Sequence, residues 1–322
     1  MTNKHSHDGH HHDHDHAHHD HSHAHGHGHH HAPQSFNAAF GIAVTLNLGF
    51  TIFQFIYAML ANSMSLLADA AHNFGDVFGL ILAWGANWLL TRPARKRYSY
   101  GYKRTTIIAA IINALILVAT SALIAYESIY KLMHLSAVNE HLVIVVALVG
   151  IFINGGTALL FMRGSHDDLN IKGAFLHLLG DMMVSFGVVI AAVLILYTHK
   201  IWIDPLVGLL IVAVILWGTW GLLRDSVRLI LDAIPHHINH QGIQEYLEKL
   251  PGVAAVHDLH IWGLSTKEVA LTAHIVMPDK VLTAADYEKI NHDLKHEFRI
   301  NHATIQVETG SKEFPCERSE TC

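Results

Sequence analysis

The chain has 322 residues, of which 51% are hydrophobic and 15% charged, and its formal net charge is −6 when histidine is counted as neutral. Its two cysteines, Cys316 and Cys322, lie at the extreme C-terminus, which excludes a fold built on a disulfide framework. Because 31 residues are histidine, the real charge near neutral pH depends on their protonation and on bound metal.

Residues 1–35 form a polar tail with sixteen histidines between His5 and His31, interleaved with Asp, Ser, Ala and Gly. The tail has no apolar run that could build a core or serve as the h-region of a signal peptide, so we expect it to be disordered. Histidine-rich tracts bind borderline metals such as Zn²⁺ through neutral imidazole. A purification tag is the alternative, but the irregular spacing and the interleaved aspartates argue against it.

Residues 36–226 contain six apolar runs, each suited to a membrane-spanning helix, which needs ~20 residues. The predicted spans are 40–60, 66–90, 105–131, 142–162, 171–197 and 203–222. The loop 91–104, TRPARKRYSYGYKR, is strongly basic, and further basic residues follow the fourth and sixth spans. The opposite loops are poor in basic residues, so the positive-inside rule predicts that both termini are cytoplasmic.

Residues 227–310 turn polar and form a domain of their own, followed by a flexible tail at 311–322. An amphipathic helix at 238–250 precedes two runs rich in Val and Ile, at 253–263 and 268–277, which read as strands. A second helix begins with a cap signal, Thr283 followed by Asp286, and a last strand covers 302–308. The order αββαβ predicts a small α+β domain with a thin core, which pairwise association would stabilise.

Two of the predicted spans carry the same charged pattern. His72 and Asp76 lie four residues apart in the second span, and His177 and Asp181 lie four apart in the fifth. This spacing puts both side chains on one helix face, and two such helices facing each other offer two imidazoles and two carboxylates, a set suited to tetrahedral Zn²⁺. A carboxylate at mid-bilayer costs ~2.5–3.5 kcal/mol, so a duplicated pair indicates function rather than coincidence.

Other polar and small residues of the spans have more than one interpretation. Asp69 lies one turn before His72 and fits a metal ligand on the way into the site, a partner for His72, or a structural hydrogen-bonding group. Four glycines near the pairs would let the second and fifth spans approach closely; they are Gly75, Gly79, Gly180 and Gly187. Asp204 and Pro205 read as the N-cap and first turn of the sixth span, with no role in transport.

Taken together, these segments resemble the cation diffusion facilitator family of zinc transporters. The resemblance covers the chain after the tail and rests on SLLADAAHNFGD, YGYKR, AFLHLLGD, LLRDSVRLILDAIP, VHDLHIW and HATIQVE. Within the family, the chain resembles the bacterial inner-membrane proteins that export zinc, cadmium and cobalt. The family implies a homodimer, a six-span membrane domain, a cytoplasmic domain of metallochaperone-like αββαβ fold, and exchange of Zn²⁺ for H⁺ by alternating access.

The resemblance also assigns residues. It places His72, Asp76, His177 and Asp181 on the transport site, and Arg104 and Asp232 on a charge pair that links the membrane and cytoplasmic parts. It places His257 and His274 on a regulatory metal site, where Glu308 can serve as the third ligand. Gln306 replaces a ligand of other members, so we expect one ion there rather than two.

Two further sets of residues belong to this domain and the tail that follows it. His260, on the strand face opposite His257, reads as structural. Cys316 and Cys322 could add soft ligands, although they lack the tight C-x-x-C spacing.

The predicted function is efflux of divalent zinc, with cadmium and cobalt as further candidates, by proton antiport across a bacterial inner membrane. We expect Zn²⁺ as substrate and as regulatory ion, protons as counter-ion, no organic cofactor, and no nucleic acid among the partners. An intramembrane metalloprotease would need the H-E-x-x-H base, but Asn73 and Leu178 follow the two histidines. A metal sensor that uses its spans only as anchors is the other alternative, and the direction of transport is not readable from the residues alone.

Overall fold

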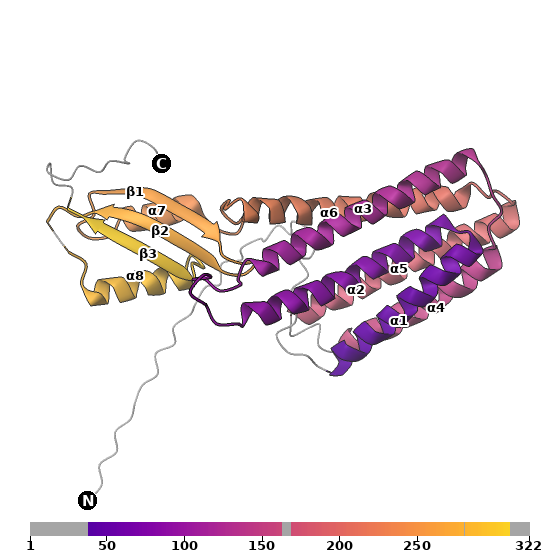
Figure 1. Cartoon of the computed structure of the whole chain (residues 1–322), viewed down its shortest axis with the longest axis horizontal. Coiled ribbons are helices and arrows are strands. Elements are labelled where there is room, and N and C mark those ends of the chain that lie inside the picture. The colour runs from indigo at the N-terminus through magenta and orange to yellow at the C-terminus, as the bar shows by residue number, and fades with distance from the viewer. Residues whose placement is uncertain (1–37, 163–168, 280, 310–322) are drawn as a thin grey trace, which may run out of the picture.

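The computed structural model describes residues 38–162, 169–279 and 281–309, and shows a bundle of six long helices followed by a small domain with a three-stranded sheet (Figure 1). The six helices are long and apolar enough to cross a membrane. Their bounds are α1 Ala38–Ala61, α2 Met64–Leu90, α3 Thr105–Met133, α4 Glu140–Met162, α5 Leu169–Thr198 and α6 Ile203–Ile230. The predicted spans are confirmed, except that α6 continues eight residues beyond the predicted end at 222.

The helices fall into two groups that Figure 1 separates. Helices α3 and α6 pack along each other, as do α4 and α5, while α2 lies between and contacts both groups. The bundle has a near end, where α6 leads into the small domain, and a far end formed by the segments 62–63, 134–139 and 199–202. At the near end, Lys103 forms an ion pair with Glu268, and the backbone N–H of Thr266 donates to Thr106 Oγ1 at 3.2 Å. The small domain is therefore fastened to the start of α3 and the end of α6.

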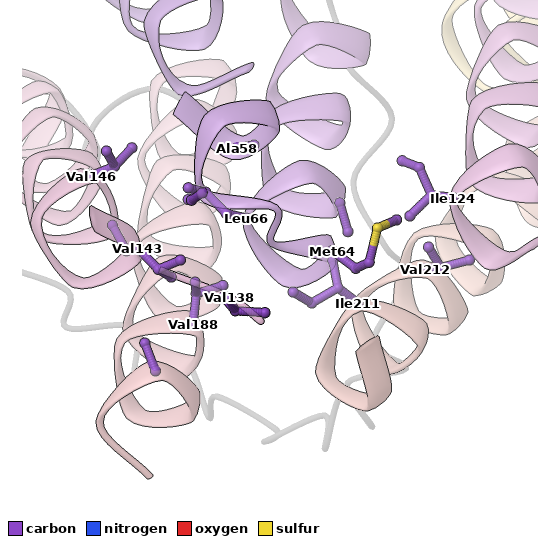
Figure 2. Close-up of a cluster of buried hydrophobic side chains, with 14 of the residues drawn as sticks. Ala58, Met64, Leu66, Ile124, Val138, Val143, Val146, Val188, Ile211 and Val212 are labelled. Carbon is purple, nitrogen blue, oxygen red and sulfur yellow. The ribbon is translucent and has the colours of Figure 1, made fainter. Parts of the chain in front are cut away.

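The far end of the bundle holds a dense apolar core (Figure 2). On one side of the start of α2, Leu66 is fully buried and lies toward Val143 of α4 and Val188 of α5. On the other side, Met64 lies among Ile124 of α3 and the α6 residues Ile211 and Val212. Side chains from all six helices contribute to this cluster, so the six helices are held together at the far end.

The turn between α1 and α2 is fixed by polar contacts at the far end. Asn62 has a positive φ of 55°, which asparagine tolerates better than most residues, and its Nδ2 donates to Ser136 Oγ at 2.9 Å. Lys131 Nζ donates to the backbone oxygen of Asn62 at 2.9 Å and also bonds its side-chain oxygen. These bonds tie the α1–α2 turn to the end of α3 and the segment that follows it.

Asp204 does not cap its own helix, which corrects the prediction from the sequence. Helix α6 begins at Ile203 with Trp202 as N-cap residue, and Asp204 lies in its first turn. The Asp204 carboxylate instead accepts hydrogen bonds from the first turn of α2: Met64 N at 2.5 Å, Ser63 Oγ at 2.6 Å and Ser65 Oγ at 2.6 Å. It caps α2 from another helix, because free N–H groups at a helix start attract a carboxylate wherever it comes from.

The expected role of the glycines is also wrong. A Cβ on Gly75 would lie 2.1 Å from Leu117 Cδ2, and one on Gly79 would lie 2.7 Å from Asn113 Nδ2, and both of these neighbours are on α3. Gly180 and Gly187 have open space where a Cβ would be. The small residues of α2 therefore bring it close to α3 rather than to α5.

The C-terminal domain has the predicted order: α7 His240–Glu248, β1 Ala255–Gly263, β2 Val269–Val276, α8 Ala284–His296 and β3 His302–Glu308. The sheet order is β1-β2-β3, with β1 antiparallel and β3 parallel to β2. Apolar residues of α7, α8 and the sheet share one core cluster. The predicted cap of α8 is confirmed, because Thr283 and Asp286 form a reciprocal capping box.

One hydrogen bond joins the two helices of this domain: the Tyr246 hydroxyl on α7 donates to Asp293 Oδ2 on α8 at 2.8 Å. This bond holds the pKa of the Asp293 carboxyl below its ordinary value. Burial, together with the carboxylate, raises the pKa of Tyr246. The hydroxyl therefore stays protonated and donates throughout the neutral range.

Candidate functional site

Helices α2 and α5 bring the two predicted His/Asp pairs together. His72 and Asp76 lie one turn apart on α2, and His177 and Asp181 lie one turn apart on α5. The rings of His72 and His177 form a T-shaped pair, and their centroids lie 6.1 Å apart. The four side chains thus converge between two helices that are far apart in the sequence.

The distances within this group suit a single tetrahedral cation. His72 Nε2 lies 3.5 Å from Asp181 Oδ1, and His177 Nε2 lies 3.3 Å from Asp76 Oδ2 and 3.6 Å from Asp181 Oδ2. A tetrahedral ion with ligand bonds of ~2.0 Å separates its ligands by ~3.3 Å. One donor atom each from His72, Asp76 and Asp181 also lies within 4.8 Å of the others, with His177 at the edge of this trio. His177 Nε2, within 3.3–3.6 Å of both carboxylates, is close enough to offer a fourth ligand atom.

The two sides of the site differ in how tightly the helices are packed. Toward the far end, the α2 residues Leu66, Ala68, Asp69 and Ala70 are fully buried, and the α5 residues Ser185, Val188, Ala191 and Ala192 are buried. Toward the near end, Ala86 is the one buried residue of α2 from Phe78 to Leu90, and Leu178 is the one buried residue of α5 among those described before Asp181. The site is therefore closed toward the far end and loosely covered toward the near end.

Asp69 has partners that the sequence did not predict. Its Oδ2 accepts from Gln54 Nε2 of α1 at 2.7 Å and from Ser185 Oγ of α5 at 2.9 Å. Asn73 Nδ2 in turn donates to Gln54 Oε1 at 3.0 Å. Gln54 and Ser185 were missed because a single polar residue in an apolar helix gives no periodic signal, although Ser185 follows Asp181 by one turn on the same face of α5.

A second group of candidate ligands lies on the sheet of the C-terminal domain. The β1–β2 register places His257 opposite His274, and the β2–β3 register places Glu308 beside Val276. Glu308 contacts both histidines: Oε1 lies 2.8 Å from His274 Nδ1, and Oε2 lies 3.2 Å from His257 Nε2. Donor atoms of the three residues lie within 4.8 Å of one another, close enough for one ion. Gln306 donates from Nε2 to Glu308 Oε1 at 3.0 Å, so it orients the carboxylate.

A β-bulge corrects the placement of His260. The register of β1 shifts between His257 and His260, and Asp258, within the shift, has a positive φ of 54°. His257 therefore pairs with His274 and His260 with Thr272, two residues of the same face of β2. His260 lies on the same sheet face as His257, not on the opposite one. Asp258, which the sequence did not single out, lies 3.2 Å from His260 Nε2 and 3.7 Å from His274 Nε2.

The predicted charge pair between the two parts of the chain is formed in the structure. Arg104 Nη2 lies 2.6 Å from Asp232 Oδ1, with both side chains about half exposed. It stands next to the Lys103–Glu268 pair at the near end. The histidine-rich tail and the C-terminal tail with Cys316 and Cys322 lie outside the described residues.

Comparison with known proteins shows the family of the chain. The profile described as the cation efflux transmembrane domain matches residues 41–231, and that of the cation efflux protein, cytoplasmic domain, matches residues 235–310. The chain is 34% identical, over 81% of its length and 85% of the relative, to the cadmium, cobalt and zinc/H(+)-K(+) antiporter of Bacillus subtilis. It is 32% identical to the metal cation efflux system protein CzcD of Cupriavidus metallidurans, over 87% of each chain. It is also 32% identical to the zinc transporter ZitB of Escherichia coli, over 84% of this chain and 85% of the relative.

The transmembrane match covers more than half of the chain, and these relatives cover most of it. With six span-length helices and a C-terminal sheet domain, the chain belongs to the cation efflux family, also called the cation diffusion facilitators.

Proposed function

We propose that this protein exports Zn²⁺, with Cd²⁺ and Co²⁺ as further substrates, by proton antiport through His72, Asp76, His177 and Asp181. The observation that carries the proposal is the pair of distances, 3.5 Å between His72 Nε2 and Asp181 Oδ1 and 3.3 Å between His177 Nε2 and Asp76 Oδ2, that joins α2 to α5 in the middle of a membrane domain. Two imidazoles and two carboxylates favour zinc and its softer neighbours over Mg²⁺ or Mn²⁺, which prefer oxygen ligands alone. The names of the relatives, which include zinc, cadmium and cobalt antiport, agree with this substrate range.

Charge balance supports antiport. A Zn²⁺ ion held by two neutral imidazoles and two carboxylates makes a site with no net charge. Two protonated imidazoles beside the same two carboxylates, without the metal ion, also make a site with no net charge. Exchange of the cation for protons therefore avoids an uncompensated charge in a low-dielectric region, where such a charge is costly. Zinc binding also requires deprotonated ligands, so protons and metal compete for the same atoms.

The uneven covering of the site supports alternating access. In this proposal the ion enters from the loosely covered near side, and the dense far side blocks its exit. Transport then requires a second state in which the far side opens and the near side closes. The basic loop 91–104 at the near end and the positive-inside rule assign this end to the cytoplasm, with both chain termini on that side. The direction is then out of the cytoplasm, across the inner membrane in a bacterium.

The C-terminal domain supplies a regulatory site and a dimer surface in this proposal. His257, His274 and Glu308 would hold one regulatory ion. The sheet face that carries these residues also carries His260 and Gln306 and lies opposite the helix-covered core. A second copy of the chain covering this face would shield the ion from water and add apolar contact to a small domain. We expect Glu308→Gln to lower the zinc affinity of this site in binding titrations and to leave the membrane site intact.

Zinc flux into proteoliposomes under an imposed pH gradient tests the proposal. We expect gradient-dependent flux in the wild type and its loss in His177→Ala and Asp181→Ala, because each removes a ligand. His141→Ala, which changes an exposed histidine in the first turn of α4, serves as the matched control and should transport normally. Flux retained in folded His177→Ala would remove this site from the pathway. Zinc binding without any flux in the wild type would favour a sensor.

A further inference from the structure

Asp69 lies in the layer directly beyond the four proposed ligands, toward the far end. It precedes His72 by one turn on α2, and Ser185 follows Asp181 by one turn on α5. One turn corresponds to ~5.4 Å along a helix. The hydrogen bond from Ser185 Oγ to Asp69 Oδ2, at 2.9 Å, therefore crosses between the two ligand-bearing helices just outside the metal site.

The same carboxylate joins a third helix. Gln54 Nε2 of α1 donates to Asp69 Oδ2 at 2.7 Å, and Asn73 holds the other end of the Gln54 amide. Asp69, Gln54 and Ser185 are all fully buried. The three helices α1, α2 and α5 thus meet at one carboxylate oxygen, and the apolar far-end core begins immediately beyond it.

We propose that Asp69 is a gating residue, which closes the far side of the metal site through its hydrogen bonds to Ser185 and Gln54 and releases them when the cation leaves. This proposal rests on the transport function proposed above. It assigns Asp69 a role in moving between states, which is distinct from holding the metal.

A permanent structural tie accounts less well for these contacts. A carboxylate inside a membrane helix costs ~2.5–3.5 kcal/mol, and apolar side chains of similar size would join the helices without that cost. Asp69 Oδ1 is buried and has no hydrogen-bond partner among the described residues, so the group is only half satisfied in this state. Hydrogen bonds from two different helices to one oxygen can be exchanged for others when the helices move.

The test measures access from the far side. In a background with Cys316→Ser and Cys322→Ser, Ala192→Cys places a thiol two turns beyond Ser185 on the same face of α5, where Ala192 is buried. Intact cells are treated with a membrane-impermeant maleimide, and the labelling rate is measured in zinc-free medium. We expect slow labelling in this parent protein and labelling about tenfold faster after Ser185→Ala or Asp69→Ala, which corresponds to ~1.4 kcal/mol.

Two further variants make the result specific. Asp69→Asn keeps an oxygen that accepts from Ser185 and Gln54, so its labelling rate should stay within about twofold of the parent. Ser128→Ala removes a buried hydroxyl of α3 that has no partner among the described residues, and it should not change the rate. The melting temperature of each purified variant is also measured in detergent, which reports whether the membrane domain is folded.

The outcomes separate the gate from its rivals. Parent-like labelling of Ser185→Ala in a protein that melts like the parent overturns the proposal. An equal rise in Ser128→Ala, or a rise in Asp69→Asn as large as in Asp69→Ala, also overturns it, because the effect would then not follow these hydrogen bonds. Labelling needs no zinc flux, so retained flux in His177→Ala would refute the proposed transport site without altering the labelling result.

Discussion

Replacing Asp204 with alanine should strongly destabilise the far end of the bundle. Asp204 is 1% exposed, and its carboxylate accepts four hydrogen bonds from the start of α2: three at 2.5–2.6 Å and one from Ser65 N at 3.3 Å. The two serine hydroxyls can bond each other in the variant, because Ser63 Oγ and Ser65 Oγ lie 3.2 Å apart. The backbone N–H groups of Met64 and Ser65 have no such replacement.

The expected magnitude follows from these two donors. Each buried donor left without a partner costs ~1–3 kcal/mol, and loss of a carboxylate at a helix N-terminus costs up to ~2 kcal/mol in a partly buried setting. We therefore expect Asp204→Ala to lower the free energy of unfolding by ~3–5 kcal/mol, in the range for removing one partner of a buried charged contact. Asp204→Asn keeps the shape and one acceptor oxygen, so its cost should be ~1–2 kcal/mol.

Unfolding in mixed detergent micelles, followed by tryptophan fluorescence, measures the effect. Glu140→Ala is the matched control, because Glu140 is another acid in the first turn of a helix at the far end. It should cost less than ~1 kcal/mol. A loss below ~1 kcal/mol for Asp204→Ala would show that water or another group replaces the carboxylate, and would refute the reasoning from unsatisfied donors.

Three further predictions concern the junction, the helix crossings and the C-terminal domain. Charge reversal of Arg104 or Asp232 alone should lower zinc flux several-fold, with less than ~1 kcal/mol lost in stability because the pair is half exposed. Reversal of both charges should restore the flux. Failure to restore it would exclude a role for this ion pair in transport. Gly208→Ala should cost ~1–3 kcal/mol, because its Cβ would lie 3.0–3.1 Å from the Met64 backbone and Cβ. Gly187→Ala, where a Cβ would meet open space, should leave the free energy of unfolding unchanged in the same measurement. An equal loss of stability in Gly187→Ala and Gly208→Ala would contradict the argument from contacts. Tyr246→Phe should lower the melting temperature near neutral pH. The hydrogen bond that it removes lowers the pKa of the Asp293 carboxyl, so the difference in melting temperature from the wild type should shrink as the pH falls below about 4. A difference that stays constant with pH would exclude this coupling.

Features carried by local sequence could be predicted, and features that depend on distant partners could not. The six spans follow from long apolar runs, the αββαβ order from the periodicity of apolar residues, and the capping box at Thr283 from a local pair of residues, so each needs one segment alone. The repeated His/Asp spacing also indicated which residues would converge, because two membrane helices rarely carry the same costly pair unless both contribute to one site. The partners of Asp69 and Asp204 lie on other helices, 15 to 141 positions away, and no local pattern marks them.

Two incorrect predictions have specific physical causes. Glycines permit close approach, but which neighbour approaches is decided by the packing of the whole bundle, and for Gly75 and Gly79 it is α3. Strict alternation along β1 would place His257 and His260 on opposite faces, but one bulged residue reverses the assignment. The bulge occurs at an aspartate with positive φ, a residue type that adopts this conformation without the glycine that would have signalled it.

The attachment of the C-terminal domain has a mechanical consequence. The domain is joined to α3 and α6 through the chain itself and through the Lys103–Glu268 and Arg104–Asp232 pairs, whereas the proposed ligands are carried by α2 and α5. Rotation of the domain would turn the α3–α6 pair with it, relative to the other four helices. Any signal from metal bound to the sheet would reach α5 through α2, which contacts both groups, or directly from α6, which also contacts α5. Stiffening the α3–α6 pair would then be expected to change the rate of turnover without changing which ion is bound.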